Sequence, residues 1–374
     1  MGIPIPVVYL AEEESENGKK SVVIDGQQRL QSFFNFIENK FSLSGLSVYP
    51  ELQGKKFNEL IPLYQDRILD CSIRTITFKE GANGDLKFNV FERLNTGAVA
   101  LNEQELRNCI YRGSYNNLLK ELSQDPDFRF ILGIGKTERR MLDVQHVLRF
   151  TAFYNHTYLQ YRSPMKRFLN EDMRENRDIS VEKQEKIRKA FKNSVSLVKS
   201  MLGERAFRRY QPGGDTNPSG NWDTKQFNSS LYDILMYCFA DADKNLIMRN
   251  LDAIREAYIE LMTTDKDFID SITKATSDQQ MVVRRFDKWR MKLDDVLKHD
   301  TNQPRCYSRE FKQQLFEQSP ICSICGQLIS DIDDAAVDHI KQYWQGGSTT
   351  EDNARLTHRY CNISRSKHDD GSDT

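Results

Sequence analysis

The sequence lacks several features that would assign a broad class of protein at once. It has no apolar run of the roughly 18–20 residues needed to cross a bilayer, so we expect no membrane-spanning segment. The N-terminal residues MGIPIPVVYLAEEE have no basic leader of the kind that begins a signal peptide. Pro6 stands where a myristoylation motif requires Ser or Thr. Together these absences predict a cytoplasmic protein.

The chain also has no excess of charge of either sign. Its 53 Lys and Arg side chains against 54 Asp and Glu give a formal net charge of −1. A nucleic-acid partner, which a strongly basic chain would suggest, is therefore neither predicted nor excluded by charge. Any contact with nucleic acid has to come from local patches.

Cysteine is scarce, with seven residues, and the odd number argues against a complete set of disulfides. Four cysteines are scattered singly along the chain, and in a reducing compartment we expect them to be inert thiols. They are Cys71, Cys109, Cys238 and Cys306. The other three cluster near the C-terminus and carry most of the functional information.

What is present predicts an α+β protein with more than one domain. The 374 residues, 39% of them hydrophobic, allow two or three cores of ordinary size. Short β-branched runs at 6–10, 21–24 and 72–78 predict strands, and apolar residues spaced three or four apart predict helices almost throughout 115–298. We read residues 211–226 as a polar loop inside that helical region. The predicted domains are 1–115, 116–300 and 301–374.

Two pairs of metal-ligand residues lie in the C-terminal region. Cys322 and Cys325 form a C-x-x-C pair, and His358 and Cys361 form a second pair with the same spacing. Four such ligands complete a tetrahedral zinc site without an open position, which is the pattern of a structural site. Such sites contribute about 10–16 kcal/mol of apparent binding free energy in zinc-finger peptides. The alternative is that His358 is free and faces DNA, which would leave zinc weakly bound or absent.

Between the two pairs lies Asp338-His339, which the zinc site leaves available for chemistry. A neutral imidazole can accept a proton from water, and general-base catalysis of this kind is typically worth about 10²–10⁴-fold in rate. Carboxylate and amide oxygens are hard ligands suited to Mg²⁺, which can neutralise charge on a phosphate.

The string VDHIKQYWQGGSTTEDNARLTHRYCNISRSK, within residues 305–368, resembles the HNH, or ββα-metal, endonucleases that carry a zinc knuckle. The resemblance implies hydrolysis of DNA with Mg²⁺ or Mn²⁺ and with His339 as the general base. It implies that Asp338 and Asn362 hold the catalytic ion and that Asn353 ties the active-site loop in place. The family usually has Cys at the position of His358, so we expect a Cys₃His zinc site.

Two alternatives remain open for this region. A zinc knuckle that only docks a partner would need the two ligand pairs but not Asp338, His339, Asn353 and Asn362 together. A cluster of basic residues could contact phosphates on one face or could be the solvated face of a charged helix. That cluster consists of Arg355, Arg359, Arg365 and Lys367.

A second motif lies near the N-terminus, where a polar turn containing Gly26 separates the strand-like run Val23-Ile24 from a helical pattern. Such turns offer backbone N–H groups to an anion at a helix N-terminus, and Arg29 adds a planar donor for phosphate. A plain strand–turn–helix corner is the alternative.

The strings IDGQQRL and, at 91–111, FERLNTGAVALNEQELRNCIY resemble the DGQQR family (domain of unknown function 262), which is similar to the ParB/sulfiredoxin fold. That family includes components of bacterial anti-phage and modified-DNA restriction systems of the SspE and GmrSD type. Members normally carry a further N-terminal segment, so the resemblance implies a truncated form of the fold. It also implies a nucleotide-binding or regulatory site with possible NTP hydrolysis. The implied site residues are Asp25, Gly26, Gln27, Gln28, Arg29 and Asn95.

These resemblances together predict a defence or restriction nuclease that cuts double-stranded DNA, with modified DNA as a candidate substrate. A homo-oligomer is compatible with this prediction. The alternative is a nucleotide-responsive, ParB-like DNA-binding regulator whose zinc knuckle is only a docking module.

Overall fold

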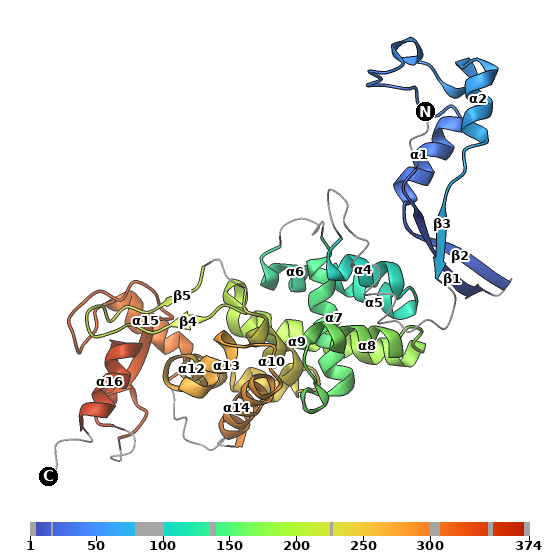
Figure 1. The fold of residues 1–374 in the computed structure, drawn as a ribbon. Helices are drawn as coiled ribbons and strands as arrows, with labels where there is room; N and C mark the ends of the chain where they lie inside the picture. The colour runs from blue at the N-terminus through green and yellow to red at the C-terminus, as the bar shows by residue number, and fades with distance from the viewer. Residues whose placement is uncertain are drawn as a thin grey trace. The chain divides into compact units, whose positions relative to one another are not determined.

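The computed structural model describes residues 5–15, 18–78, 101–134, 140–224, 227–298, 307–342 and 347–369 (Figure 1). The chain divides into two compact units, residues 1–110 and residues 111–374. Each unit is described by itself below. No helix within the described ranges is long and apolar enough to cross a membrane.

The N-terminal unit contains a three-stranded sheet in the order β2-β1-β3. Strand β1 (Val8–Ser15) pairs antiparallel with β2 (Gly18–Asp25) and parallel with β3 (Thr75–Phe78). These strands confirm the three predicted runs. The helical segments of this unit are α1 (Gln27–Ile37), η1 (Pro50–Leu52), η2 (Phe57–Glu59), α2 (Pro62–Leu69) and α4 (Glu103–Ile110).

Helix α1 buries a different residue from those that its apolar spacing suggested. Phe36 is buried, whereas Phe34, which the helical pattern included, is 55% exposed. The ring of Phe36 packs against Phe41 and Phe57, with ring centroids 5.5 and 6.0 Å apart. The short helix thus turns its buried side toward the segment that follows it, a tertiary contact that local periodicity does not encode.

The first part of the second unit is helical, as predicted. On α7 the residues Val144, Val147, Leu148 and Thr151 are all buried, which confirms that this stripe is core. The elements of this part are α5 (Ser114–Ser123), α6 (Pro126–Leu132), α7 (Leu142–His156), η3 (Tyr158–Gln160), α8 (Met165–Glu175), α9 (Val181–Leu202), η4 (Gly203–Arg205), α10 (Ser229–Phe239), α11 (Lys244–Arg249), α12 (Leu251–Thr264), α13 (Lys266–Thr273) and α14 (Gln279–Lys298).

The polar stretch 211–226 is not all loop, which corrects the sequence-based assignment. Strand β4 (Tyr210–Gln211), at the start of the stretch, pairs antiparallel with β5 (Asn221–Trp222) within it. Tyr210 and Trp222 are buried and pack edge to face, with ring centroids 5.3 Å apart. Two aromatic anchors therefore close an otherwise polar loop into a hairpin.

The same unit ends in a small ββα module. Strand β6 (Ala335–His339) pairs antiparallel with β7 (Ala354–His358), and α16 (Arg359–Asp369) follows β7 directly and packs on both strands. Helix α15 (Arg309–Gln318) precedes the pair, and η6 (Glu351–Asn353) leads into β7. The buried core of this module consists of Cys322, Ile329, Ala335, Leu356 and Cys361. So small a core, two of whose members are cysteines, needs a staple to be stable.

Buried charges join the ββα module to the helical part of its unit. The carboxylate of Asp333, just before β6, is 4% exposed and accepts hydrogen bonds from Arg205, Arg255 and the indole Nε1 of Trp222, the last at 3.1 Å. Tyr210 donates to the neighbouring Asp334. The β4–β5 hairpin thus lies beside the module (Figure 1) and is bonded to it.

A second buried cluster centres on Glu256 of α12. Arg359, the first residue of α16, donates to both of its carboxylate oxygens, at 2.5 and 3.0 Å. Lys312 of α15 donates to the same carboxylate at 3.0 Å. Burial raises the pKa of Glu256, but the two cations outweigh that effect and hold it well below its usual range.

Glu256→Gln is expected to loosen the attachment of the module. The substitution leaves the cations of Arg359 and Lys312, both less than 10% exposed, without a counter-charge. Breaking a buried pair in this way costs about 3–5 kcal/mol, and we expect the lower end because Glu256 itself is 28% exposed. The urea midpoint of unfolding is the measurement. Glu260→Gln is the matched control, since Glu260 lies one turn further along α12, is 54% exposed and pairs with Lys292. A surface pair of that kind contributes about 0–1 kcal/mol, so equal shifts in the two variants would contradict the cluster's role.

Low pH should have the same effect on the wild-type protein as Glu256→Gln, because protonation removes the charge of the Glu256 carboxylate. The folded-state pKa of Glu256 lies below the unfolded value of about 4.3. Its contribution to stability is therefore complete above that pH and is lost as the pH falls toward the folded pKa. The difference in midpoint between wild type and Glu256→Gln should be constant from neutral pH to about pH 5 and shrink below about pH 4.

Candidate functional site

A tight turn presents the first two cysteines of the C-terminal module. Ile321 and Leu328 form a β-bridge across the turn, and the N–H of Cys322 donates to Gln327 O at 2.9 Å. Gly326 has φ +73°, a left-handed conformation that glycine adopts without strain. The glycine directly after Cys325 therefore lets the chain reverse and bring both thiols to the same side.

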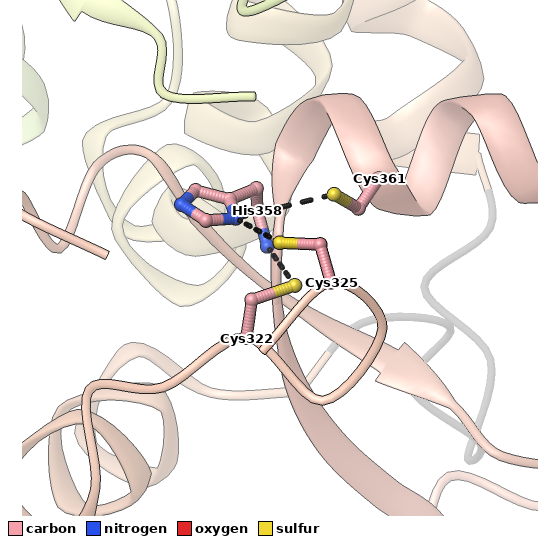
Figure 2. A group of neighbouring side chains, drawn as sticks. All are labelled: Cys322, Cys325, His358 and Cys361. Atoms are coloured by element: carbon pink, nitrogen blue, oxygen red, sulfur yellow. Dashed lines mark hydrogen bonds between the residues drawn. The ribbon is translucent and has the colours of Figure 1, made fainter. Parts of the chain in front are cut away.

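The second ligand pair lies at the junction of β7 and α16, where His358 ends the strand and Cys361 sits in the first turn of the helix. The ligand atoms of Cys322, Cys325, His358 and Cys361 all lie within 4.8 Å of one another (Figure 2). Cys325 Sγ is 3.4 Å and Cys361 Sγ 3.9 Å from His358 Nδ1, and the backbone N–H of His358 donates to Cys322 Sγ at 3.3 Å. The structure thus brings together the four predicted zinc ligands.

The orientation of His358 settles which ring nitrogen faces the thiols. Its Nε2 lies 3.3 Å from the carbonyl oxygen of Leu328, which can only accept, so Nε2 donates there and Nδ1 is the ring nitrogen that faces the sulfurs. Metal-bound histidines commonly make such a second hydrogen bond. His358 is fully buried, so the alternative that it faces DNA is wrong.

The electrostatics of the cluster favour a bound cation. Burial raises the pKa of the Cys322 thiol, but hydrogen bonds from the backbone of Cys325, His358 and Ile324 outweigh it and lower the pKa to about 7. Burial and the neighbouring Cys322 raise the pKa of Cys361. Cys322 and Cys361 therefore resist carrying negative charge together unless a positive ion balances them, and Zn²⁺ suits the donor set of three thiols and one imidazole.

His339, at the end of β6, is held by two side chains from other segments. Its Nε2 and Thr349 Oγ1 form a hydrogen bond 3.0 Å long, and its ring packs against Tyr307 with centroids 4.8 Å apart. The hydroxyl of Tyr307 donates to Thr350 O at 3.1 Å, which ties the two supports together. Burial lowers the pKa of His339 and nearby Asp338 only partly opposes this, which favours the neutral form of the imidazole.

Asn353 fastens the loop that follows His339. Its Oδ1 accepts the N–H of Lys341 at 2.8 Å, and its Nδ2 donates to Lys341 O at 3.1 Å and Ser348 O at 2.8 Å. A Cβ at Gly347 would lie 1.9 Å from Lys341 O, so the close approach that Asn353 clamps requires glycine there. The predicted role of Asn353 in fixing the active-site loop requires such bonds to both ends of the loop.

His339 and Asn362 open onto the same cavity, which has a volume of about 420 Å³. Its opposite wall is α12 of the helical part, with Asp252 and Glu260, and Arg309 lines it at the start of α15. The candidate general base thus faces a space enclosed by the ββα module on one side and a helix of the same compact unit on the other.

Asp338 does not line that cavity. Its side chain is 8% exposed, and Oδ2 accepts from Arg355 at 2.7 and 2.8 Å and from Arg365 at 2.7 Å. Both guanidinium groups bind this same oxygen, and Oδ1 accepts no hydrogen bond from the described residues. The oxygen donors that a hard cation prefers are thus present at Asp338 Oδ1 and at the amide of Asn362. The shared ion itself stays a prediction.

The predicted DNA-contacting cluster needs correction. Arg359 is buried and bound to Glu256, so it is not available to a phosphate. Arg355 and Arg365 are half-buried and hold Asp338. The side chain of Lys367 lies outside the described residues.

In the N-terminal unit the IDGQQRL motif forms a strand–turn–helix corner between β2 and α1. Gly26 has φ +95°, and a Cβ there would lie 2.9 Å from Val8 Cγ2. Arg29 pairs with Asp25 at 2.5 Å and donates to Pro6 O at 2.8 Å, so it ties α1 to the segment before β1. The predicted nucleotide-site residues Gln27 and Gln28 are exposed in the first turn of α1. Asn95 lies outside the described residues. The proposed nucleotide role stays a prediction.

The sequence did not predict the two residues that hold the His339 ring. Tyr307 and Thr349 come from outside the quoted ligand pairs and bear no motif of their own. The acidic run Asp331–Asp334 was a usable signal, because several carboxylates so close to an apolar strand need buried cationic partners.

Comparisons with known proteins agree with both resemblances. Residues 1–112 match the family model of the GmrSD restriction endonuclease N-terminal domain, and residues 322–369 match that of the HNH endonuclease. No curated protein and no solved structure gives a significant match. The chain therefore joins a GmrSD-type restriction endonuclease N-terminal domain to an HNH endonuclease domain, which makes it a DNA-cleaving hydrolase.

Proposed function

We propose that this chain hydrolyses DNA phosphodiesters in a reaction that requires Mg²⁺ or Mn²⁺, with His339 as the general base. The observation that carries the proposal is the cavity shared by His339 and Asn362. A neutral, oriented imidazole beside a space for a phosphate is what proton abstraction from water requires.

Each neighbouring residue has a role in this proposal. Thr349 and Tyr307 orient the imidazole, and Asn353 holds the loop that carries Thr349 close to β6. Asp338 and Asn362 would hold the divalent cation, which when bound neutralises charge on the phosphate and the leaving oxygen. Arg355 and Arg365 fix the Asp338 carboxylate from the side of Oδ2. Zinc at Cys322, Cys325, His358 and Cys361 would be structural, because four protein ligands leave no open position.

The biological role that we propose is restriction of foreign, modified DNA in anti-phage defence. Its support is the match of residues 1–112 to the N-terminal domain of a restriction endonuclease of the GmrSD type. We propose that this domain binds a nucleotide and regulates cutting, with the corner formed by Asp25 to Arg29 as its candidate site.

The direct test incubates supercoiled plasmid with the full-length protein and Mg²⁺, Mn²⁺ or EDTA. We expect nicked or linear product with either metal ion and none with EDTA. Parallel reactions on modified and unmodified DNA, with and without added NTP, test the finer claims. A gel shift without strand cleavage in any metal would contradict the proposed reaction, and cleavage in EDTA would contradict its dependence on metal.

A further inference from the structure

The ββα module keeps few cations for its substrate. Arg355 and Arg365 bind Asp338, and Arg359 and Lys312 bind Glu256. The exposed basic side chains that remain among the described residues of the module are those of Arg309 and Lys341. Because affinity for DNA comes largely from neutralised phosphates, a DNA-cutting chain with this inventory needs a basic surface elsewhere.

The helical part of the same unit has such a surface, which we call the lysine groove. It is a hollow of about 850 Å³ between α9, the start of α6 and the connection from α10 to α11. Lys186, Lys189 and Lys192 project into it from α9, and Lys244 from the first turn of α11. All four side chains are exposed.

The lysine groove is built on fixed elements. Asn193 of α9 donates to Phe239 O at 2.9 Å and to Ala242 O at 3.0 Å, which anchors the α10–α11 connection on α9. Lys244 donates to Ser196 Oγ at 2.9 Å across the groove. The opposite face of α9 is buried core, with Ile187 and Phe191 as examples. The lysines are therefore held at set positions by a packed helix.

The acidic residues of the groove are each engaged elsewhere. Asp127 pairs with Lys199 at 2.6 Å, Asp125 caps α6 by accepting from Phe128 N at 3.0 Å, and Asp241 accepts from Tyr154 Oη at 3.0 Å. By contrast, none of the four groove lysines forms an ion pair with a carboxylate in the described part of the chain. Lys186 Nζ lies 5.7 Å from the centroid of the Tyr154 ring and Lys192 interacts electrostatically with Glu121, but both side chains are exposed and their charges remain accessible to an external anion.

We propose that the lysine groove binds the phosphate backbone of the duplex DNA that the nuclease module cuts, an inference that rests on the proposed function. From Lys186 to Lys192 the axis of α9 rises about 9 Å, at about 1.5 Å per residue. Three successive phosphates on one DNA strand span two rises of about 3.4 Å each, a somewhat shorter length that the long, flexible lysine side chains can match. Contacts of this kind position a duplex without reading its sequence.

The test measures binding of a fluorescently labelled DNA duplex to the full-length protein by anisotropy, without added Mg²⁺ or Mn²⁺ and without a chelator that would remove zinc, over a range of salt concentrations. The variant carries Lys186→Gln, Lys189→Gln and Lys192→Gln. We expect its affinity at low salt to fall at least tenfold. We also expect the slope of log K against log salt to become shallower by about 2.7, at about 0.9 per lost phosphate contact.

The matched control carries Lys266→Gln, Lys274→Gln and Lys298→Gln, which remove the same charge from α13, the residue after it, and the end of α14. It should bind as the wild type does. The inference would be overturned if the groove variant bound DNA with the same affinity and slope as the wild type. It would also be overturned if both triple variants lost affinity equally, or if the wild type showed no measurable binding. Because the binding assay contains no added Mg²⁺ or Mn²⁺, its result is independent of catalysis, whereas loss of cleavage in Mg²⁺ with normal binding would concern the proposed function alone.

Discussion

His339→Ala is expected to abolish plasmid cleavage while leaving the fold and the zinc content unchanged. Removal of a general base typically lowers the rate by about 10²–10⁴-fold, which places cutting below detection in an ordinary plasmid assay. The imidazole packs on Tyr307 and bonds Thr349 but takes part in none of the ion pairs that hold the module to α12. The four zinc ligands are also separate from it.

The neighbouring residue supplies the matched control. Ile340 follows His339 directly and its side chain is 49% exposed, so Ile340→Ala should cut plasmid at the wild-type rate. Zinc content and the thermal unfolding curve are measured on both variants. Cleavage by His339→Ala at a rate within a few-fold of wild type, after contaminating nucleases are excluded, would rule out His339 as the base.

The zinc ligands could be predicted from sequence because their geometry is almost entirely local. Each pair spans two intervening residues, and the turn that carries the first pair bonds the strand that carries the second, since the N–H of Ser323 donates to Leu356 O at 2.9 Å. Spacing within a turn and within a helix end is a property of the backbone, so a short string is sufficient evidence. The same holds for Asn353, whose side-chain hydrogen bonds to described residues go to Lys341 and Ser348, both nearby in the sequence.

The attachment of the module could not be predicted in the same way. Arg359 and Glu256 are 103 residues apart, and Asp333 and Arg255 are 78 apart. Nothing in the local pattern around Arg359 distinguishes a buried ion pair from a phosphate contact, because a basic residue at a helix start suits both. Phe36 in the N-terminal unit is a second case in which the local pattern is insufficient. There the contact with the ring of Phe57 decides which side of α1 is buried.

Loss of a zinc ligand is expected to have the largest effect on stability. Cys322→Ser should release the metal and unfold residues 307–369, since about 10–16 kcal/mol of apparent zinc-binding free energy exceeds what a core of five small or medium side chains provides. The measurements are zinc content per chain and the rate of proteolysis within the module. Cys71→Ser is the control, because Cys71 lies in the N-terminal unit and is not one of the four clustered ligands.

The consequences of Cys322→Ser should extend beyond the module itself. When the module unfolds, Glu256 loses Arg359 and Lys312, and the buried guanidinium of Arg255 loses Asp333. An unpaired buried charge is costly, so α12 and the β4–β5 hairpin should also become more accessible to protease. A variant that keeps one zinc ion per chain, or that stays as protease-resistant as Cys71→Ser, would show that the cluster does not staple this module. Selective loss of the module with α12 fully protected would instead place the stabilising effect of zinc within the module alone.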